Sequence, residues 1–278
     1  MSARPIQEPG RVERFLPREH GATAMLLIPF VCVAILAREW RWSELATLVA
    51  AFAVLAAKDP MVVLARQRFV WKQRHLETNV AAQWLTGWMV VLFISGLVLV
   101  ITWPLTAILA MGLGVCLSST LAVVIHVKNR QRSTLFQVAS AAALTSSSLA
   151  TSLSATGAIA PWCWWLWLLM AMQAAAGILV VHARLDARIA SRLPAPSRDR
   201  FRRAAQVSLS ALACAALTAA ILGRGWIALA LLVVVIGYGY DLRSQRDPAG
   251  IQLPLKTVGQ RALALSFLFS VLLMIGLW

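Results

Sequence analysis

The stretch Val80–Thr102 reads VAAQWLTGWMVVLFISGLVLVIT and contains no charged residue. The stretch that follows it, Pro104–His126, is equally apolar. A helix of about 20 apolar residues is long enough to cross the ~30 Å hydrocarbon core of a bilayer. The two stretches therefore predict a pair of membrane-spanning helices joined by a short WPL turn.

Seven further apolar stretches flank this pair, so that the chain has nine predicted spans, or eight if the fifth lies at the interface. Helices are favoured over a barrel, because the stretches lack period-2 alternation and each segment must satisfy its own backbone hydrogen bonds in lipid. The second and eighth stretches are short for a span. The seven are Gly21–Ala37, Trp42–Ala57, Leu135–Ala155, Trp162–His182, Ala204–Gly223, Trp226–Tyr240 and Val258–Trp278.

The composition of the whole chain agrees with a membrane protein. Of the 278 residues, 60% are hydrophobic and only 13% are charged, which excludes an ordinary soluble enzyme, a disordered chain and a fibrous protein. The four cysteines lie singly in apolar stretches, so neither a disulfide framework nor a zinc ribbon is expected. The polar, proline-interrupted start of the chain does not resemble a signal peptide. We expect an all-α, polytopic transmembrane helix bundle, with residues 1–20 as a cytoplasmic segment and 21–278 as one transmembrane domain.

The net charge of +15 is distributed by loop parity. Of the 26 lysines and arginines, 23 precede the first span or lie in every second connection, and only Arg38, Arg41 and Arg224 lie on the opposite side. The positive-inside rule then places the N-terminus in the cytoplasm and, with nine spans, the C-terminus outside, as in a bacterial inner membrane. Nine of the twelve tryptophans lie at the predicted outer ends, as in an interfacial aromatic belt.

This distribution also bears on partners. The basic residues are spread over five loops without a nucleic-acid-binding motif, so orientation in the membrane explains them and nucleic-acid binding is not expected. The expected partner is the lipid bilayer, with a lipid or isoprenoid as a candidate ligand. The sequence does not indicate an oligomeric state.

The fifth stretch is built from small residues, in LFQVASAAALTSSSLATSLSATG. Small residues let helix backbones approach closely, and serine and threonine hydroxyls form hydrogen bonds between helices. A tightly packed central helix is one interpretation, and a polar lining of an internal cavity is the other.

The candidate site residues lie in the inner loops, because the outer connections are short. Arg18 and His20 stand where the first span begins, in LPREHGATAMLLIPF. Lys58 and Asp59 end the second span, where an acid needs a cationic partner and either Lys58 or Arg66 is at hand. The alternative for this stretch is a plain helix end, with Pro60 stopping or restarting the helix.

Two more groups complete the candidates. Arg130 and Arg132 follow the fourth span beside His126 and Asn129, and arginine forks suit carboxylates and phosphates as well as plain anchoring. His182 and Asp186 are four residues apart on one helix face, which suits a proton relay, a pair of metal ligands or a simple surface contact. Tyr238, Tyr240 and Asp241 either anchor an interface or close the same inner cavity.

The opening LPREHGATAMLLIPF resembles the YwiC-like family of bacterial membrane proteins, in which a proline, a basic residue and His-Gly precede the first span. The segment NRQRSTLFQVASAAALTSSSLATSLSATG and the closing KTVGQRALALSFLFSVLLMIGLW are similar to that family as well. The resemblance implies a multi-pass architecture and carries no known activity with it.

The chain has a more distant likeness to the UbiA-like intramembrane prenyltransferases. This likeness implies nine helices, with active-site loops after the second helix and after the sixth. Asp59 and Asp186 occupy those two places, but that family has acid-rich runs there, and this chain has one acid in each. Metal binding is therefore not expected, and Asp59 and Asp186 are only weak candidates for metal ligands. Mg²⁺ would be required only if the protein were an enzyme of this type.

Three functions remain open from the sequence. The first is a protein that binds or transports a hydrophobic or anionic small molecule at a cytoplasm-facing vestibule framed by the residues named above. The second is a prenyltransferase-type enzyme, and the third is a structural or assembly partner in the membrane. No catalytic residue is assigned by any motif.

Overall fold

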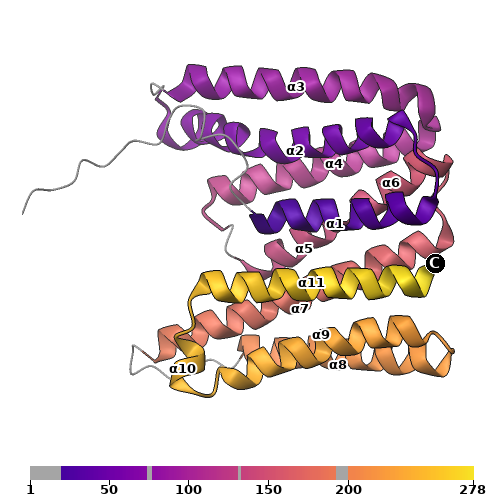
Figure 1. The fold of residues 1–278 in the computed structure, drawn as a ribbon. Coiled ribbons are helices and arrows are strands. Elements are labelled where there is room, and N and C mark those ends of the chain that lie inside the picture. Colours follow the sequence, from indigo (N-terminus) through magenta and orange to yellow (C-terminus); the bar gives the residue numbers. More distant parts are fainter. Residues whose placement is uncertain (1–19, 74–76, 131–132, 192–199) are drawn as a thin grey trace, which may run out of the picture. The chain divides into compact units, whose positions relative to one another are not determined.

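The structure of the protein is a computed structural model that describes residues 20–73, 77–130, 133–191 and 200–278. These residues form helices and short connections, and no strand occurs among them (Figure 1). The helices are α1 (His20–Ala37), α2 (Trp42–Arg66), the π-helix η1 (Gln67–Trp71), α3 (Glu77–Thr102), α4 (Leu105–Val127), α5 (Thr134–Thr145), α6 (Ser147–Thr156), α7 (Pro161–Ala190), α8 (Arg200–Ile221), α9 (Gly225–Ser244), α10 (Pro248–Ile251) and α11 (Leu255–Leu277).

Seven helices in the described part of the chain are long and apolar enough to cross a membrane. They are α2 with η1, α3, α4, α7, α8, α9 and α11. The apolar part of α1, Gly21–Ala37, is shorter. The prediction of a multi-pass, all-helical membrane protein is therefore confirmed, whereas the number of nine spans and the orientation of the termini are not.

The fifth predicted span is not one helix. It is divided at Ser146 into α5, with 12 residues, and α6, with 10, and neither reaches the length of a span. Hydroxyl groups compete for the helix carbonyls at the break. Thr145 Oγ1 donates to the carbonyl oxygen of Ala141 at 3.0 Å, and Ser146 Oγ donates to that of Ala143 at 2.6 Å. Such local side-chain bonds offer the backbone an alternative to a continuous helix.

The second and eighth predicted spans are longer than their apolar stretches. Pro60 neither stops nor restarts α2, which continues to Arg66 and is extended by η1 to Trp71. A proline is tolerated in a membrane helix when neighbouring groups satisfy the freed backbone, and Pro60 is fully buried. α9 likewise extends to Ser244, with 20 residues. The expectation of two short spans was wrong, because the polar residues that follow the apolar stretches did not end α2 or α9.

Contacts along the chain divide it into two compact units. Among the described residues, unit 1 contains His20, 46–73 and 77–130, and unit 2 contains 21–45, 133–191 and 200–278. α2 begins in unit 2 and continues in unit 1. The expectation of a single transmembrane domain over 21–278 remains a prediction.

In unit 1, α3 and α4 form the helical pair that the opening stretch predicts. α4 has no buried residue, and large apolar side chains such as Phe93, Ile101 and Leu109 are exposed. An exposed surface of this kind suits lipid rather than water. The C-terminal end of α4 is fixed by Arg66 of α2, whose Nη2 donates to the carbonyl oxygen of His126 at 2.7 Å and to Asn129 Oδ1 at 2.9 Å.

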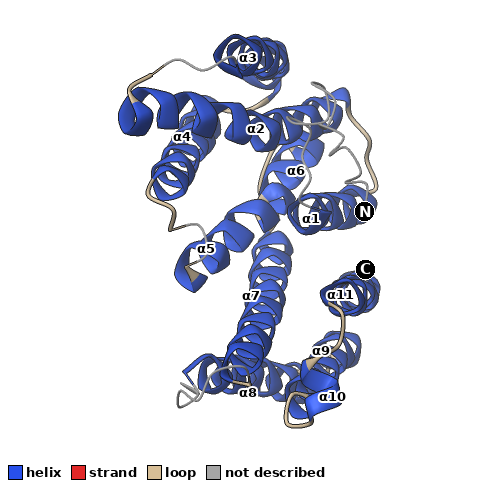
Figure 2. Ribbon diagram, turned by 90° about the vertical axis from the view of Figure 1, so that its left-hand side faces the viewer, coloured by secondary structure: helices blue, strands red, loops and turns tan. Residues whose placement is uncertain are grey.

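In unit 2, α7 is the central helix and contacts α5, α6, α8, α9, α10 and α11 (Figure 2). α9 packs against both α8 and α11. A polar junction ties α7, α9 and α11 together, because Gln173 Nε2 donates to Tyr238 Oη and to Ser266 Oγ, both at 2.8 Å. Gly177 makes room for this junction, since a Cβ there would lie 2.6 Å from Tyr238 Oη.

The hydroxyl groups of α6 are turned onto backbone carbonyls. Ser147 Oγ donates to the carbonyl oxygen of Leu26 at 2.7 Å and so joins α6 to α1. Thr151 Oγ1 donates within α6, to the carbonyl oxygen of Ser147 at 2.7 Å. These bonds favour the packing interpretation of the small-residue stretch over a polar cavity lining.

Charged and aromatic residues separate to opposite ends of unit 2. The end where α7 and α9 finish and α8 and α11 begin carries the arginines discussed below. The exposed tryptophans lie at the other end, where α7 and α9 begin and α11 finishes, and the guanidinium of Arg38 is 4.0 Å from the ring centroid of Trp278 there. These exposed tryptophans are Trp40, Trp42, Trp164, Trp165, Trp226 and Trp278.

Candidate anion-binding site

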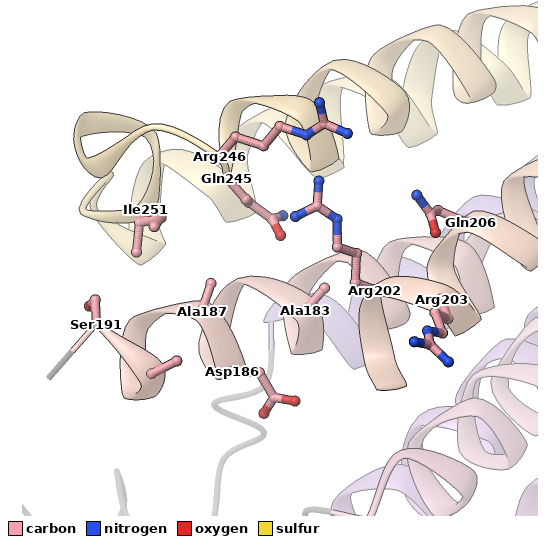
Figure 3. A pocket seen from close by; sticks show the side chains of 11 residues that line it. Ala183, Asp186, Ala187, Ser191, Arg202, Arg203, Gln206, Gln245, Arg246 and Ile251 are labelled. Atoms are coloured by element: carbon pink, nitrogen blue, oxygen red, sulfur yellow. The ribbon is translucent and has the colours of Figure 1, made fainter. Parts of the chain in front are cut away.

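A cavity of about 680 Å³ lies at the arginine-rich end of unit 2, between the end of α7, the start of α8 and the turn from α9 into α10. Figure 3 shows the side chains around it. The lining residues are Ala183, Asp186, Ala187, Ala190, Ser191, Arg202, Arg203, Gln206, Gln245, Arg246 and Ile251.

The α7 wall of the cavity is made of small side chains. Ala183, Ala187 and Ala190 are spaced by four and three residues, so they share one face of the helix. Methyl groups on this face leave space that longer side chains would fill. The sequence of α7 thus leaves the volume open, and the polar groups of α8 and α9 border it.

Three arginines line the cavity, from the start of α8 and from the turn after α9. Arg202 and Arg203 lie in the first turn of α8, and Arg246 follows α9. In Figure 3 the guanidinium of Arg202 points toward Gln245 and Arg246, while the guanidinium of Arg203 and the carboxyl group of Asp186 point away from them. None of these three arginines forms an ion pair with an acid in the described part of the chain.

Asp186 is the single acid among the lining residues, so the cavity wall carries an excess of positive charge. Guanidinium groups present several N–H donors in a planar fork, which matches the oxygens of phosphate and carboxylate groups. Guanidinium groups that line one cavity repel one another, and a bound anion reduces that repulsion. The arrangement is suited to binding an anion.

Gln245 is buried at the edge of the cavity. The residue is only 6% exposed, and its Nε2 donates to the carbonyl oxygen of Val180 at 3.2 Å. Gln206 lies four residues after Arg202 on α8 and so shares its side of the helix. Two amide side chains therefore accompany the arginines as neutral hydrogen-bonding groups.

Two other arginines, Arg184 and Arg188 of α7, hold the α9–α11 connection in place and are called the clamp below. Arg184 Nη1 donates to the carbonyl oxygen of Gly250 at 2.6 Å. Arg188 Nε donates to that of Ile251 at 2.6 Å, and its Nη2 donates to that of Leu253. The clamp thus fixes the segment that carries Ile251 into the cavity wall.

Charge and space both specify this clamp. Arg184 is fully buried, and its Nη2 lies 3.7 Å from Asp241 Oδ1 on α9. Arg261 of α11 lies 4.0 Å from the same oxygen. Gly250 is required for the close approach of α10, because a Cβ there would clash with the carbonyl oxygen of Ser244. A buried arginine in a membrane protein is costly unless it is paired, which Asp241 and the Gly250 carbonyl achieve.

The sequence-predicted pair His182 and Asp186 is divided between two environments. Asp186 lines the cavity, as a site residue should. His182 Nε2 instead lies 2.8 Å from Gln137 Oε1 of α5, and its ring is 5.2 Å from that of Phe201. The hydrogen bond of His182 therefore links α7 to α5, which does not favour the proton-relay interpretation.

The candidates in unit 1 have partners within that unit. Asp59 pairs with its neighbour Lys58, at 3.8 Å between Nζ and Oδ1. Arg66 is not the partner of Asp59, because its guanidinium binds the end of α4. There the carbonyls lack helical partners, and a cation is favoured by the helix dipole. Arg130 follows the same helix end and is exposed.

The structure does not describe the side chains of three predicted site residues. Arg18 and Arg132 lie outside the described residues, and α1 begins at His20, whose side chain is outside them too. Within the described ranges, no cluster of three or more histidines, cysteines and acids could hold a metal ion. The structure thus offers no metal ligand set around Asp59 or Asp186 in those ranges.

Sequence reasoning missed the three cavity arginines and both glutamines, although it selected Asp186. The charge pattern of the loops explains Arg202, Arg203 and Arg246 by membrane orientation and does not single them out. A signal was present in the four-residue spacing of Arg202 and Gln206, which places a cation and an amide on one side of a helix start. The contribution of Gln245 and Arg246 depends on the fold of the α9–α10 turn.

The tyrosines of α9 are likewise separated. Tyr238 is buried in the junction with Gln173, so interfacial anchoring does not describe it. Tyr240 is exposed, and Asp241 pairs with the clamp residue Arg184. None of the three lines the cavity.

Comparison with known proteins agrees with the resemblance found in the sequence. Residues 16–152 match the family model described as YwiC-like protein, and the likeness to that family is confirmed over this range. No curated protein and no solved structure matches the chain. The matched range includes the LPREHG opening and most of the small-residue stretch, and the cavity residues follow it in the chain.

Proposed function

We propose that the protein binds an anionic small molecule, with phosphate as the recognised group, in the cavity between α7, α8 and α9. The observation that carries the proposal is the set of three arginines around one cavity without acid partners in the described residues. Hydrogen bonds to charged groups are each worth about 1.5–3 kcal/mol, so a few such contacts provide measurable affinity.

We also propose that the cavity faces the cytoplasm of a bacterial cell. The support is the segregation of cations to one end of unit 2 and of exposed tryptophans to the other, which follows the positive-inside rule and the aromatic belt. In this topology the N-terminus is inside and the C-terminus outside, with α1 and the α5–α6 pair completing nine crossings. Ser191 is exposed and lines the cavity, so a Ser191→Cys variant in a cysteine-free background tests the side by labelling. A membrane-impermeant maleimide should react only after the cells are opened.

The binding proposal is tested by equilibrium dialysis of the purified full-length protein in a neutral detergent against radiolabelled pyrophosphate. Replacing Arg202, Arg203 and Arg246 together by glutamine should weaken binding at least about tenfold, equivalent to about 1.4 kcal/mol. The matched control replaces Arg224, Arg243 and Lys256 by glutamine, which removes the same charge away from the cavity lining. Equal losses in the two triple variants, or no binding by the parent protein, would overturn the proposal.

The same assay separates the prenyltransferase alternative. An enzyme of that type would need Mg²⁺ on Asp59 and Asp186, so pyrophosphate binding would depend on Mg²⁺ and be lost in Asp186→Asn. Binding through arginines alone needs no Mg²⁺, and Asp186→Asn should strengthen it, because a negative charge beside the anion is removed.

A further inference from the structure

We infer that the anion taken by the cavity is the phosphate monoester headgroup of a membrane lipid, whose chains lie on the exposed face of α8. The inference rests on the proposed function and adds the class of ligand. Three features of the molecule support it: the depth of the cavity residues in the membrane, the exposed face of α8 that continues from the cavity, and the charge of the cavity.

The cavity residues of α8 lie at the depth of lipid headgroups. α8 has 22 residues and is long enough to span the membrane. Arg203 and Gln206 occupy its first two turns, which places them at the boundary between the headgroups and the hydrocarbon core. Basic pockets between membrane helices at this level bind lipid headgroups.

The exposed face of α8 continues from the cavity into the apolar part of the helix. Arg203, Ser210, Cys214 and Ile221 are separated by seven, four and seven residues and so lie in one line along the helix. All four are exposed, as are Val207 and Leu217 beside them. A lipid whose phosphate binds at Arg203 can thus keep its chains against apolar side chains without leaving the bilayer.

The charge of the cavity favours a phosphate monoester over a diester. Three guanidinium groups and one carboxylate leave an excess of two positive charges. A phosphate monoester carries about −1.5 to −2 charges near neutral pH, whereas a diester carries one. The monoester also presents three free oxygens to the arginine forks.

Displacement of radiolabelled pyrophosphate from the full-length protein in neutral detergent micelles distinguishes the sources of the phosphate. Dioleoyl phosphatidic acid should displace it at about tenfold lower concentration than glycerol 3-phosphate, which has the same monoester without chains. Phosphatidylglycerol should be intermediate, and phosphatidylcholine should not compete.

The path of the chains is tested by Cys214→Trp, which places a large side chain in the line below Arg203. In this variant, the concentration of phosphatidic acid that displaces pyrophosphate should rise at least about threefold, and the affinity for pyrophosphate should be unchanged. Ala211→Trp is the control, because Ala211 is also exposed but is turned about 60° away from Cys214 around the helix. Ser210→Trp tests the same line if Cys214→Trp does not yield folded protein.

The failures of the two proposals are distinguishable. If pyrophosphate binds and glycerol 3-phosphate competes as well as phosphatidic acid, the lipid inference is overturned and the anion site stands. Equal effects of the Cys214 and Ala211 variants on phosphatidic acid overturn the assigned path. If pyrophosphate does not bind at all, the proposed function fails and the lipid inference fails with it.

Discussion

Two groups of arginines at one end of unit 2 differ in their partners, although the sequence does not distinguish them. The clamp arginines, Arg184 and Arg188, bind backbone carbonyls of the α9–α11 connection. The cavity arginines, Arg202, Arg203 and Arg246, have no such partners in the described residues. Each arginine of either group adds one positive charge to the asymmetry that orients a membrane protein, and what separates the groups is the set of atoms within reach of each guanidinium.

This difference indicates where ligand chemistry is to be expected. An arginine whose donors are used by the fold contributes to stability and is not available to an anion. One whose donors face a cavity contributes little to the fold and is available. The two groups should therefore respond in opposite ways to substitution: loss of stability for the clamp and loss of binding for the cavity.

The largest effect on stability is expected for Arg184→Met. The substitution leaves the Gly250 carbonyl without its donor and the buried Asp241 with Arg261 alone, and breaking a buried pair in this way costs about 3–5 kcal/mol. Thermal unfolding in detergent should show a large fall in melting temperature. The double variant R184M/D241N should recover part of the lost melting temperature, because the unpaired carboxylate is then removed. An unchanged melting temperature in R184M would show that the clamp does not support the fold.

A smaller loss is expected for Gly250→Ala. The added Cβ would clash with the Ser244 carbonyl oxygen and push α10 away from α7, at a cost of about 1–3 kcal/mol. Because the same segment carries Ile251 into the cavity, pyrophosphate affinity in equilibrium dialysis should fall as well. Gly259→Ala on α11 is the control, since a Cβ there meets no atom within 4 Å. Equal stability of the two variants would argue against a tight fit at Gly250.

Arg66→Gln in unit 1 extends the comparison to a third arginine whose donors are used. It loses the hydrogen bonds to the His126 carbonyl and to Asn129, and we expect a cost of about 1 kcal/mol in unfolding free energy. Arg68→Gln is the matched control, because Arg68 lies in η1, two residues after the end of α2, and is exposed. Pyrophosphate binding should stay within twofold of the parent in both variants. A loss of binding in R66Q would place unit 1 in the site.

The smallest change in stability is expected for the cavity variant R202Q/R203Q/R246Q. Surface substitutions away from buried networks stay within about 0.5 kcal/mol each, and the removal of three neighbouring positive charges relieves repulsion. Its melting temperature without ligand should match that of the parent. A collapse comparable to that of R184M would mean that these arginines also hold the fold together.

The sequence predicted the membrane class and most of the helices, because a long uncharged stretch such as Val80–Thr102 is too apolar to face water and is long enough to span a bilayer as a helix. It did not predict the break at Ser146, which depends on hydroxyl groups competing for helix carbonyls. It also did not predict that α2 continues through Pro60, since that depends on how neighbours satisfy the backbone.

For the candidate site, the sequence identified Asp186 but not the arginines beside it. The contacts of Arg184 and the cavity position of Arg246 both depend on how the α9–α10 turn returns to α7, which involves residues about 60 positions apart. Hydropathy and loop parity carry no information about such distant contacts. They report which side of the membrane an arginine lies on, and they do not report what its side chain touches.

Native mass spectrometry of the full-length protein, purified in a neutral detergent, tests the central claim most directly. The parent protein and the control R224Q/R243Q/K256Q should retain phosphate-containing molecules, released on activation and identified by mass. R202Q/R203Q/R246Q should retain none while remaining folded. Equal retention by the parent and both triple variants would contradict the assignment of an anion site to the cavity between α7, α8 and α9.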